Sequence, residues 1–81
     1  MHIDNVALVY VEDHGYVIDD NRPPKYSELT MRAARFPTNT QARKFIVSLT
    51  KRYKDLCDKC KIVNAEVVRD DNYELQEVRL V

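Results

Sequence analysis

The chain has 81 residues, of which 44% are hydrophobic, with one glycine and three prolines. This composition supports one modest hydrophobic core and excludes a second domain, a long flexible linker and a low-complexity tail. The formal net charge is zero, which argues against a protein that holds nucleic acid through overall charge alone. The longest apolar run, Val6 to Val11, is far too short to span a bilayer, and the first four residues lack the basic start of a signal peptide. We therefore expect one cytoplasmic domain over residues 1–81.

The zero net charge hides a strong segregation of charge along the chain. Residues 1–20 carry a net −5, residues 21–62 a net +8 and residues 63–81 a net −3. One face of the folded protein could therefore be basic although the whole is neutral. This asymmetry is the best functional clue in the sequence, and it favours a binding surface over a catalytic site.

The first quarter of the chain predicts two strands. Val6 to Val11 is a run of β-branched and apolar residues without alternation, typical of a strand that is covered on both faces. Gly15 can adopt a positive φ, so the residues before it favour a turn after which Tyr16 to Ile18 pairs back as a short second strand. Asp19 to Pro24 then reads as a polar loop, because two adjacent prolines prevent regular hydrogen bonding.

The segment Tyr26 to Phe36 fits either a strand or a helix. Leu29 and Ala33 would share one face in both conformations. A helix here would end at Pro37, directly against the next helix, with almost no connection between them. We therefore predict a strand.

The next element is the clearest in the chain. Thr38 and Gln41 have the spacing of a capping box and predict the start of a helix that runs from about Asn39 to about Cys57. Its apolar positions alternate spacings of four and three residues and form a stripe suited to packing on a sheet. The residues of this stripe are Ala42, Ile46, Leu49, Tyr53, Leu56 and Cys60, widened by Phe45 and Cys57.

Two further strands are expected after the helix. Ile62 to Arg69 and Tyr73 to Val81 are rich in β-forming residues, and the turn-forming sequence Asp70-Asp71-Asn72 separates them. The predicted fold class is therefore α+β, with a single amphipathic helix packed on a small antiparallel sheet in the order ββ(β)αββ.

The outer side of the predicted helix is basic. Positions opposite the apolar stripe are occupied by Arg43, Lys44, Val47, Lys51, Lys54 and Lys61. A solvated surface is one interpretation, because Asp55 is four residues from Lys51 and Lys59, and Asp58 is four from Lys54, so local ion pairs could form. A binding site for an acidic protein surface or a phosphate backbone is the other. The cations Arg22, Lys25, Arg32 and Arg35 would extend that site if their segment lies on the same side.

No motif in the sequence predicts an enzyme or a cofactor. Cys57 and Cys60 form a lone C-x-x-C at the expected C-terminal end of the helix, where the helix dipole disfavours a thiolate, so redox catalysis is not expected. As zinc ligands they would form only half a site, which His2, His14 or a second subunit would have to complete. We expect ordinary thiols, no metal and no cofactor.

The central part of the chain, with short strands before it and a terminal hairpin after it, resembles the strand-to-helix layout of several small bacteriophage proteins. The stretch that carries the resemblance is Met31 to Ile46, Met-Arg-Ala-Ala-Arg-Phe-Pro-Thr-Asn-Thr-Gln-Ala-Arg-Lys-Phe-Ile. These include host-takeover inhibitors and some anti-CRISPR proteins. The resemblance implies a stand-alone domain in the host cytoplasm that blocks a host complex by occupying one of its surfaces.

These observations predict a small non-enzymatic binding protein that associates with a macromolecular complex and inhibits it. The expected partner is a protein or nucleoprotein with an acidic surface. The candidate partner-binding residues are Arg43, Lys44, Val47, Lys51 and Lys54, with Arg32 and Arg35 as further candidates. Two alternatives remain open: a nucleic-acid-binding regulator that uses the same cations, and a structural homodimer through the edge strand Tyr73 to Val81, which would bury Val78 and Leu80.

Overall fold

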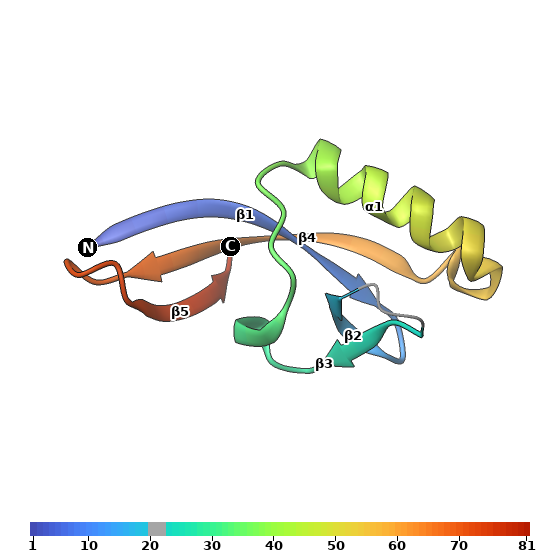
Figure 1. Ribbon diagram of the computed structural model, residues 1–81, viewed down its shortest axis with the longest axis horizontal. Coiled ribbons are helices and arrows are strands. Elements are labelled where there is room, and N and C mark those ends of the chain that lie inside the picture. The colour runs from blue at the N-terminus through green and yellow to red at the C-terminus, as the bar shows by residue number, and fades with distance from the viewer. Residues whose placement is uncertain (20–22) are drawn as a thin grey trace.

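The computed structural model describes residues 1–19 and 23–81 and contains five strands, one α-helix and two short 3₁₀ helices in this part of the chain. Figure 1 shows α1 lying along one side of a twisted sheet. In chain order the elements are β1 His2–Val11, β2 Gly15–Asp19, β3 Lys25–Ser27, η1 Thr30–Arg32, α1 Asn39–Arg52, η2 Lys54–Leu56, β4 Cys60–Arg69 and β5 Leu75–Leu80.

The sheet is antiparallel, with strand order β3-β2-β1-β4-β5. β1 and β4 pair along their whole length, from His2 opposite Arg69 to Val11 opposite Cys60. β2 pairs only with the C-terminal end of β1, where Tyr10 lies opposite Tyr16 and Val11 lies opposite Gly15. The predicted α+β class with one helix on a small antiparallel sheet is therefore confirmed.

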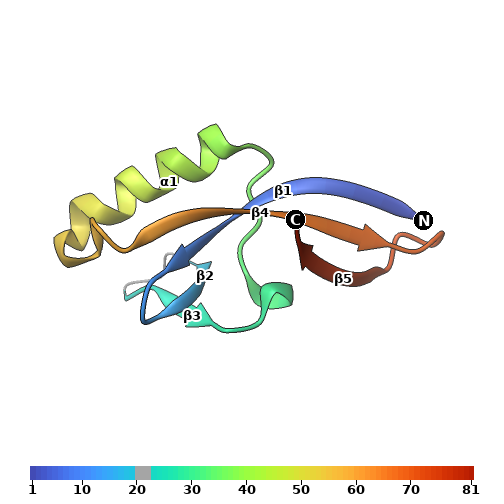
Figure 2. The ribbon, with the colours of Figure 1, turned by 180° about the vertical axis from the view of Figure 1, so that it is seen from behind.

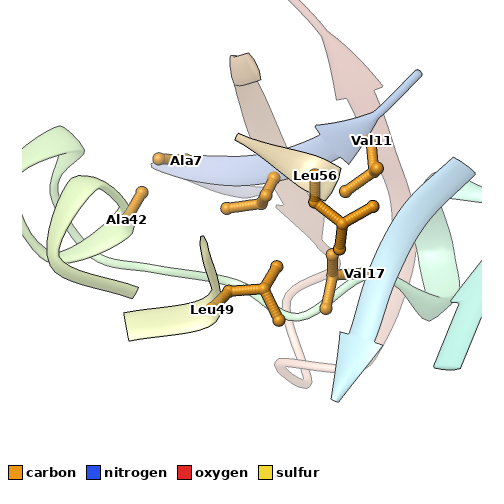
Figure 3. Packing of buried hydrophobic residues seen from close by; sticks show 7 residues of the cluster. Ala7, Val11, Val17, Ala42, Leu49 and Leu56 are labelled. Carbon is orange, nitrogen blue, oxygen red and sulfur yellow. The ribbon is translucent and has the colours of Figure 1, made fainter. Parts of the chain in front are cut away.

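Successive residues of β1 face opposite sides of the sheet, so the strand contributes to two separate cores. Ala7, Val9 and Val11 point toward α1. Figure 3 shows Leu49 of α1 and Leu56 of η2 packed with these strand residues. The full buried set of this first core is Ala7, Val9, Val11, Val17, Ala42, Leu49 and Leu56.

The second core lies on the other side of the β1–β4 ladder. Its buried residues are Leu8, Tyr16, Ala33, Ala65, Val67 and Val78. No polar or charged side chain is buried in the described part of the chain. Apart from the phenol of Tyr16, the buried side chains of both cores are apolar in these described residues.

The strand prediction for Tyr26 to Phe36 is wrong for most of that segment. β3 is confined to Lys25–Ser27, and the chain then forms η1 on the side of the β1–β4 ladder away from α1 (Figures 1 and 2). The Thr30 hydroxyl donates to the Val78 carbonyl oxygen at 2.6 Å, and Ala33 is buried in the second core. These long-range contacts fix η1 against β5, and neither is visible in the local sequence pattern.

The helix begins where the sequence predicts and ends earlier. The Thr38 side chain accepts a hydrogen bond from the Gln41 amide, which confirms the N-cap. At the other end α1 stops at Arg52, because Tyr53 leaves the helical region with φ −123° and ψ 80°. The chain continues as η2 and places Leu56 in the first core. The prediction of a helix reaching Cys57 is therefore wrong.

Strand boundaries differ from the predicted ones by several residues. β1 begins at His2 and β4 at Cys60, both earlier than expected, while β5 begins at Leu75 because Tyr73 lies in the preceding turn with φ 62°. No helix in the described residues is long and apolar enough to cross a membrane.

Candidate partner-binding face of helix α1

Packing on the sheet determines which side of α1 faces outward. Ala42 and Leu49 are fully buried against the first core. Residues displaced by about half a turn from these two point away from the sheet. Val47 is one of them, and half of its surface is exposed. Its exposure was expected from the sequence and is confirmed.

A shallow depression lies on this outward side. It is lined by Thr40, Arg43, Lys44 and Val47 and has a volume of about 280 Å³. These residues are three, four and seven positions apart, so they are neighbours on one helix face. The depression therefore combines a hydroxyl, a guanidinium and an ammonium group around an apolar side chain.

The cations of this face are not locally neutralised. In the described residues, Arg43, Lys44 and Lys51 are exposed and form no ion pair and no side-chain hydrogen bond. The local pairs expected between Asp55 and Lys51 or Lys59, and between Asp58 and Lys54, are likewise not formed between these described residues. A partner can therefore contact these cations without breaking existing ion pairs.

Three further candidate residues lie elsewhere. Lys54 belongs to η2, beyond the end of α1, and is exposed. Arg32 belongs to η1, and Arg35 follows it and donates from Nη2 to the Met31 carbonyl oxygen at 3.1 Å. Because η1 lies across the β1–β4 ladder from α1 (Figure 2), Arg32 does not extend the helix face.

The remaining expected cations are also dispersed. Lys25 lies in β3, and Lys61 lies in β4 opposite Tyr10 rather than on the helix. Arg22 falls outside the described residues. We name Thr40, Arg43, Lys44, Val47 and Lys51 the outer face of α1. Thr40 was missed in the sequence, although its spacing of three and four residues from Arg43 and Lys44 would have identified it.

The two cysteines are free thiols. Cys57 is exposed in the turn after η2, and Cys60 is half-buried at the start of β4, so the pair does not lie on the helix as predicted. Burial raises the pKa of the Cys60 thiol, and Cys57 adds to that effect. This direction makes Cys60 less nucleophilic. No group of three or more potential metal ligands occurs in the described residues.

A second depression of about 210 Å³ lies near the C-terminal end of α1. His14, Tyr26 and Tyr53 contribute its rings, together with Asp55, Leu56 and two prolines. The His14 and Tyr26 rings stack on each other with centroids 4.8 Å apart. Because the His14 and Tyr26 rings each cover one face of the other, this depression offers less free aromatic surface than its three rings suggest.

Comparison with known proteins gives no match: no protein-family model fits the chain, and no curated protein or solved structure is significantly similar to it.

Proposed function

We propose that this protein is a small non-enzymatic binding protein that uses the outer face of α1 to contact an acidic surface of a protein partner and thereby inhibits or regulates it. The observation that carries the proposal is the depression in which half-exposed Val47 lies beside Arg43 and Lys44, with both cations unpaired among the described residues. An apolar centre with a polar, solvent-accessible rim is the general anatomy of a protein–protein interface.

The arrangement divides the expected roles between these side chains. Val47 can be desolvated against a partner and would anchor the contact. Arg43, Lys44 and Lys51 surround it in solvent, where cations mainly steer association and select an acidic partner. A host complex as the target remains the expectation from the resemblance to bacteriophage inhibitors.

Nucleic acid is the second candidate partner, and the shape of the outer face favours it less. Single-strand binding proteins stack bases on exposed aromatic rings. The rings that α1 and its C-cap supply, Phe45 and Tyr53, pack against the first core instead. The outer face therefore offers phosphate contacts without a stacking platform.

Affinity capture with a matched pair of variants tests the proposal. The immobilised protein is exposed to nuclease-treated lysate of the native host, or of the host it infects, and the bound proteins are identified by mass spectrometry. We expect one stoichiometric protein partner with the wild-type protein. Val47→Asp should lose it, because a carboxylate would occupy the centre of the contact. Ser48→Asp is the control, since Ser48 is an exposed neighbour that does not line the depression.

Equal capture by Val47→Asp and the wild-type protein would refute the role of the outer face. A parallel capture from lysate without nuclease tests the alternative: if its bound components are all absent after nuclease treatment, the nucleic-acid alternative replaces the proposal. In that case binding to a labelled oligonucleotide should weaken linearly in log salt concentration, and Lys44→Ala should lower the slope by about one.

A further inference from the structure

The N-terminal half of β1 has an open edge. β4 covers one edge of the whole strand, but β2 reaches the other edge only at Tyr10 and Val11. Along residues 2–9 of β1, the only backbone pairing on this second edge in the described residues is the bridge from Ala7 to Phe36. The second edge of residues 2–6 therefore faces solvent.

The Ala7 bridge reveals which backbone groups are unpaired. The Ala7 amide donates to the Phe36 carbonyl oxygen at 2.8 Å, and its carbonyl oxygen accepts from the Phe36 amide at 2.9 Å. Backbone direction alternates along a strand, so Ile3 and Asn5 direct their N–H and C=O groups to the same side as Ala7. Those groups have no hydrogen-bond partner in the described part of the chain.

We propose that this open edge pairs with the same edge of a second copy of the chain, antiparallel and centred on Ile3. Unpaired edges of this kind are templates for strand addition. A two-fold pairing must join positions that both point outward, so it can place Ile3 opposite Ile3, Ile3 opposite Asn5, or Asn5 opposite Asn5.

Sterics and charge select one of these three registers. Centring on Asn5 would place Ile3 of the second copy beside Ala7, where Phe36 already occupies the edge. Pairing Ile3 with Asn5 would bring the two Asp4 carboxylates directly opposite each other, which is destabilising. Centring on Ile3 avoids both problems.

The Ile3-centred register is self-complementary in its side chains. It places His2 of each copy opposite Asp4 of the other, so that an imidazole can donate to a carboxylate on both sides of the axis. The His2 ring is held by stacking on Tyr73, with centroids 4.1 Å apart. On the opposite face the two partly exposed Ile3 side chains meet next to Val68, the cross-strand neighbour of Ile3.

The edge strand β5, through which the sequence predicts a possible homodimer, is partly covered by its own chain. Val78 of β5 is already buried in the second core of its own chain, and its carbonyl oxygen accepts from Thr30. Self-pairing through β5 therefore gains little from Val78. The N-terminus lies at the end of the sheet away from α1 (Figure 1), so pairing through β1 does not depend on the proposed function of the outer face.

Amide hydrogen exchange measured by NMR, together with sedimentation velocity, tests the proposal. From micromolar to millimolar protein we expect a rise from monomer to dimer. Over that range the Ile3 and Asn5 amides should exchange about tenfold more slowly, because exchange then requires dissociation. Asp4 and Val6 donate to β4, so their exchange should not change.

Two variants separate this register from other causes of dimerisation. Ile3→Pro removes an outward N–H that the β1–β4 ladder does not use, so the monomer should stay folded and the dimer should be lost. Asp4→Asn leaves the backbone intact and should weaken the dimer by removing the carboxylate opposite His2. A stronger dimer with Asp4→Asn would overturn the register.

A protein that stays monomeric at millimolar concentration overturns the proposal. A dimer without slower exchange at Ile3 and Asn5 also overturns it, since the copies would then meet through another surface. Slower exchange that appears only with an added extended peptide would assign the edge to a foreign strand instead.

Discussion

Gly15 holds the turn between β1 and β2 in a conformation that other residues rarely adopt. Its φ is +116°, and a Cβ at this position would lie 2.8 Å from the Ser27 carbonyl oxygen of β3. Both the backbone and the neighbouring strand therefore require glycine. The sequence predicted a positive φ here, but it could not reveal the close approach of β3.

We predict that Gly15→Ala destabilises the protein by roughly 2 kcal/mol or more, because backbone strain and the contact with Ser27 add together. Asp13→Gly is the matched control in the same turn. Asp13 also has a positive φ, of 70°, so glycine should be tolerated there. Urea unfolding of both variants measures the difference, and an unchanged stability of Gly15→Ala would contradict the turn geometry.

The phenol of Tyr16 makes stability depend on pH in the alkaline range. Burial raises its pKa above the ordinary 10.0, and nearby Tyr10 and Glu28 add smaller effects in the same direction. The folded state thus prefers the neutral phenol. Its contribution to stability is complete below the unfolded pKa and is lost as the pH rises through the folded pKa.

We therefore predict that the free energy of unfolding declines above about pH 10 and that Tyr16→Phe reduces this decline. Part of the decline should remain, because the pKa of Tyr26 is also raised by burial. Thermal unfolding across the alkaline range is the measurement, with the exposed Tyr73 changed to Phe as the control. A decline of the same size in Tyr16→Phe would show that this phenol is not the cause.

At the scale of elements, α1 shows how far local sequence determines structure. Its start is encoded locally, since the Thr38 hydroxyl accepts from the Gln41 amide within the same few residues. Its end is not, because the apolar spacing continues through Tyr53 and Leu56 although the chain leaves the helix at Arg52. Leu56 reaches the first core from η2, a solution that depends on tertiary packing.

The segment before α1 shows the same limit more strongly. η1 forms where Thr30 and Ala33 meet β5 and the second core, and those contacts join residues far apart in the sequence. No periodicity within Tyr26 to Phe36 encodes them. The positions of Arg32 and Arg35 could therefore not be predicted, whereas Arg43, Lys44, Val47 and Lys51 could, because all four lie on one regular helix.

The orientation of α1 makes its buried and outward-facing residues contribute unequally to stability. Leu49→Ala should cost about 3 kcal/mol, because it opens a cavity in the first core. Val47→Ala should change stability by less than about 0.5 kcal/mol, since that side chain packs on no core. Chemical denaturation of the two variants provides the comparison, and a reversed order would mean that the helix is rotated and that the outer face is assigned wrongly.

The shape of the whole molecule follows from unequal element lengths. α1 has 14 residues and spans about 21 Å, whereas ten-residue β1 and β4 span about 33 Å. The helix therefore cannot cover the entire ladder, and the sheet projects beyond it. The resulting molecule is elongated, with extents of 42 × 22 × 20 Å.

This shape separates the two proposed binding surfaces. The outer face of α1 lies at one end, and the open edge of β1 lies at the other (Figure 1). A pair of copies joined through β1 would carry both helices on the same face of the combined sheet, because Ile3 and Ala7 share the α1 side of β1 in each copy. Such a dimer could bind a partner with two sites more tightly than a monomer does.

The proposed function assigns protein binding to the outer face of α1 and not to positive charge in general. Matched charge reversal tests this most directly. One variant carries Arg43→Glu, Lys44→Glu and Lys51→Glu, and the other carries Lys25→Glu, Arg32→Glu and Arg35→Glu, so both change the net charge equally. In nuclease-treated lysate, we predict that the first variant loses the partner captured by the wild-type protein and that the second retains it. Retention by the first variant, or equal loss by both, would mean that the outer face of α1 is not the binding surface.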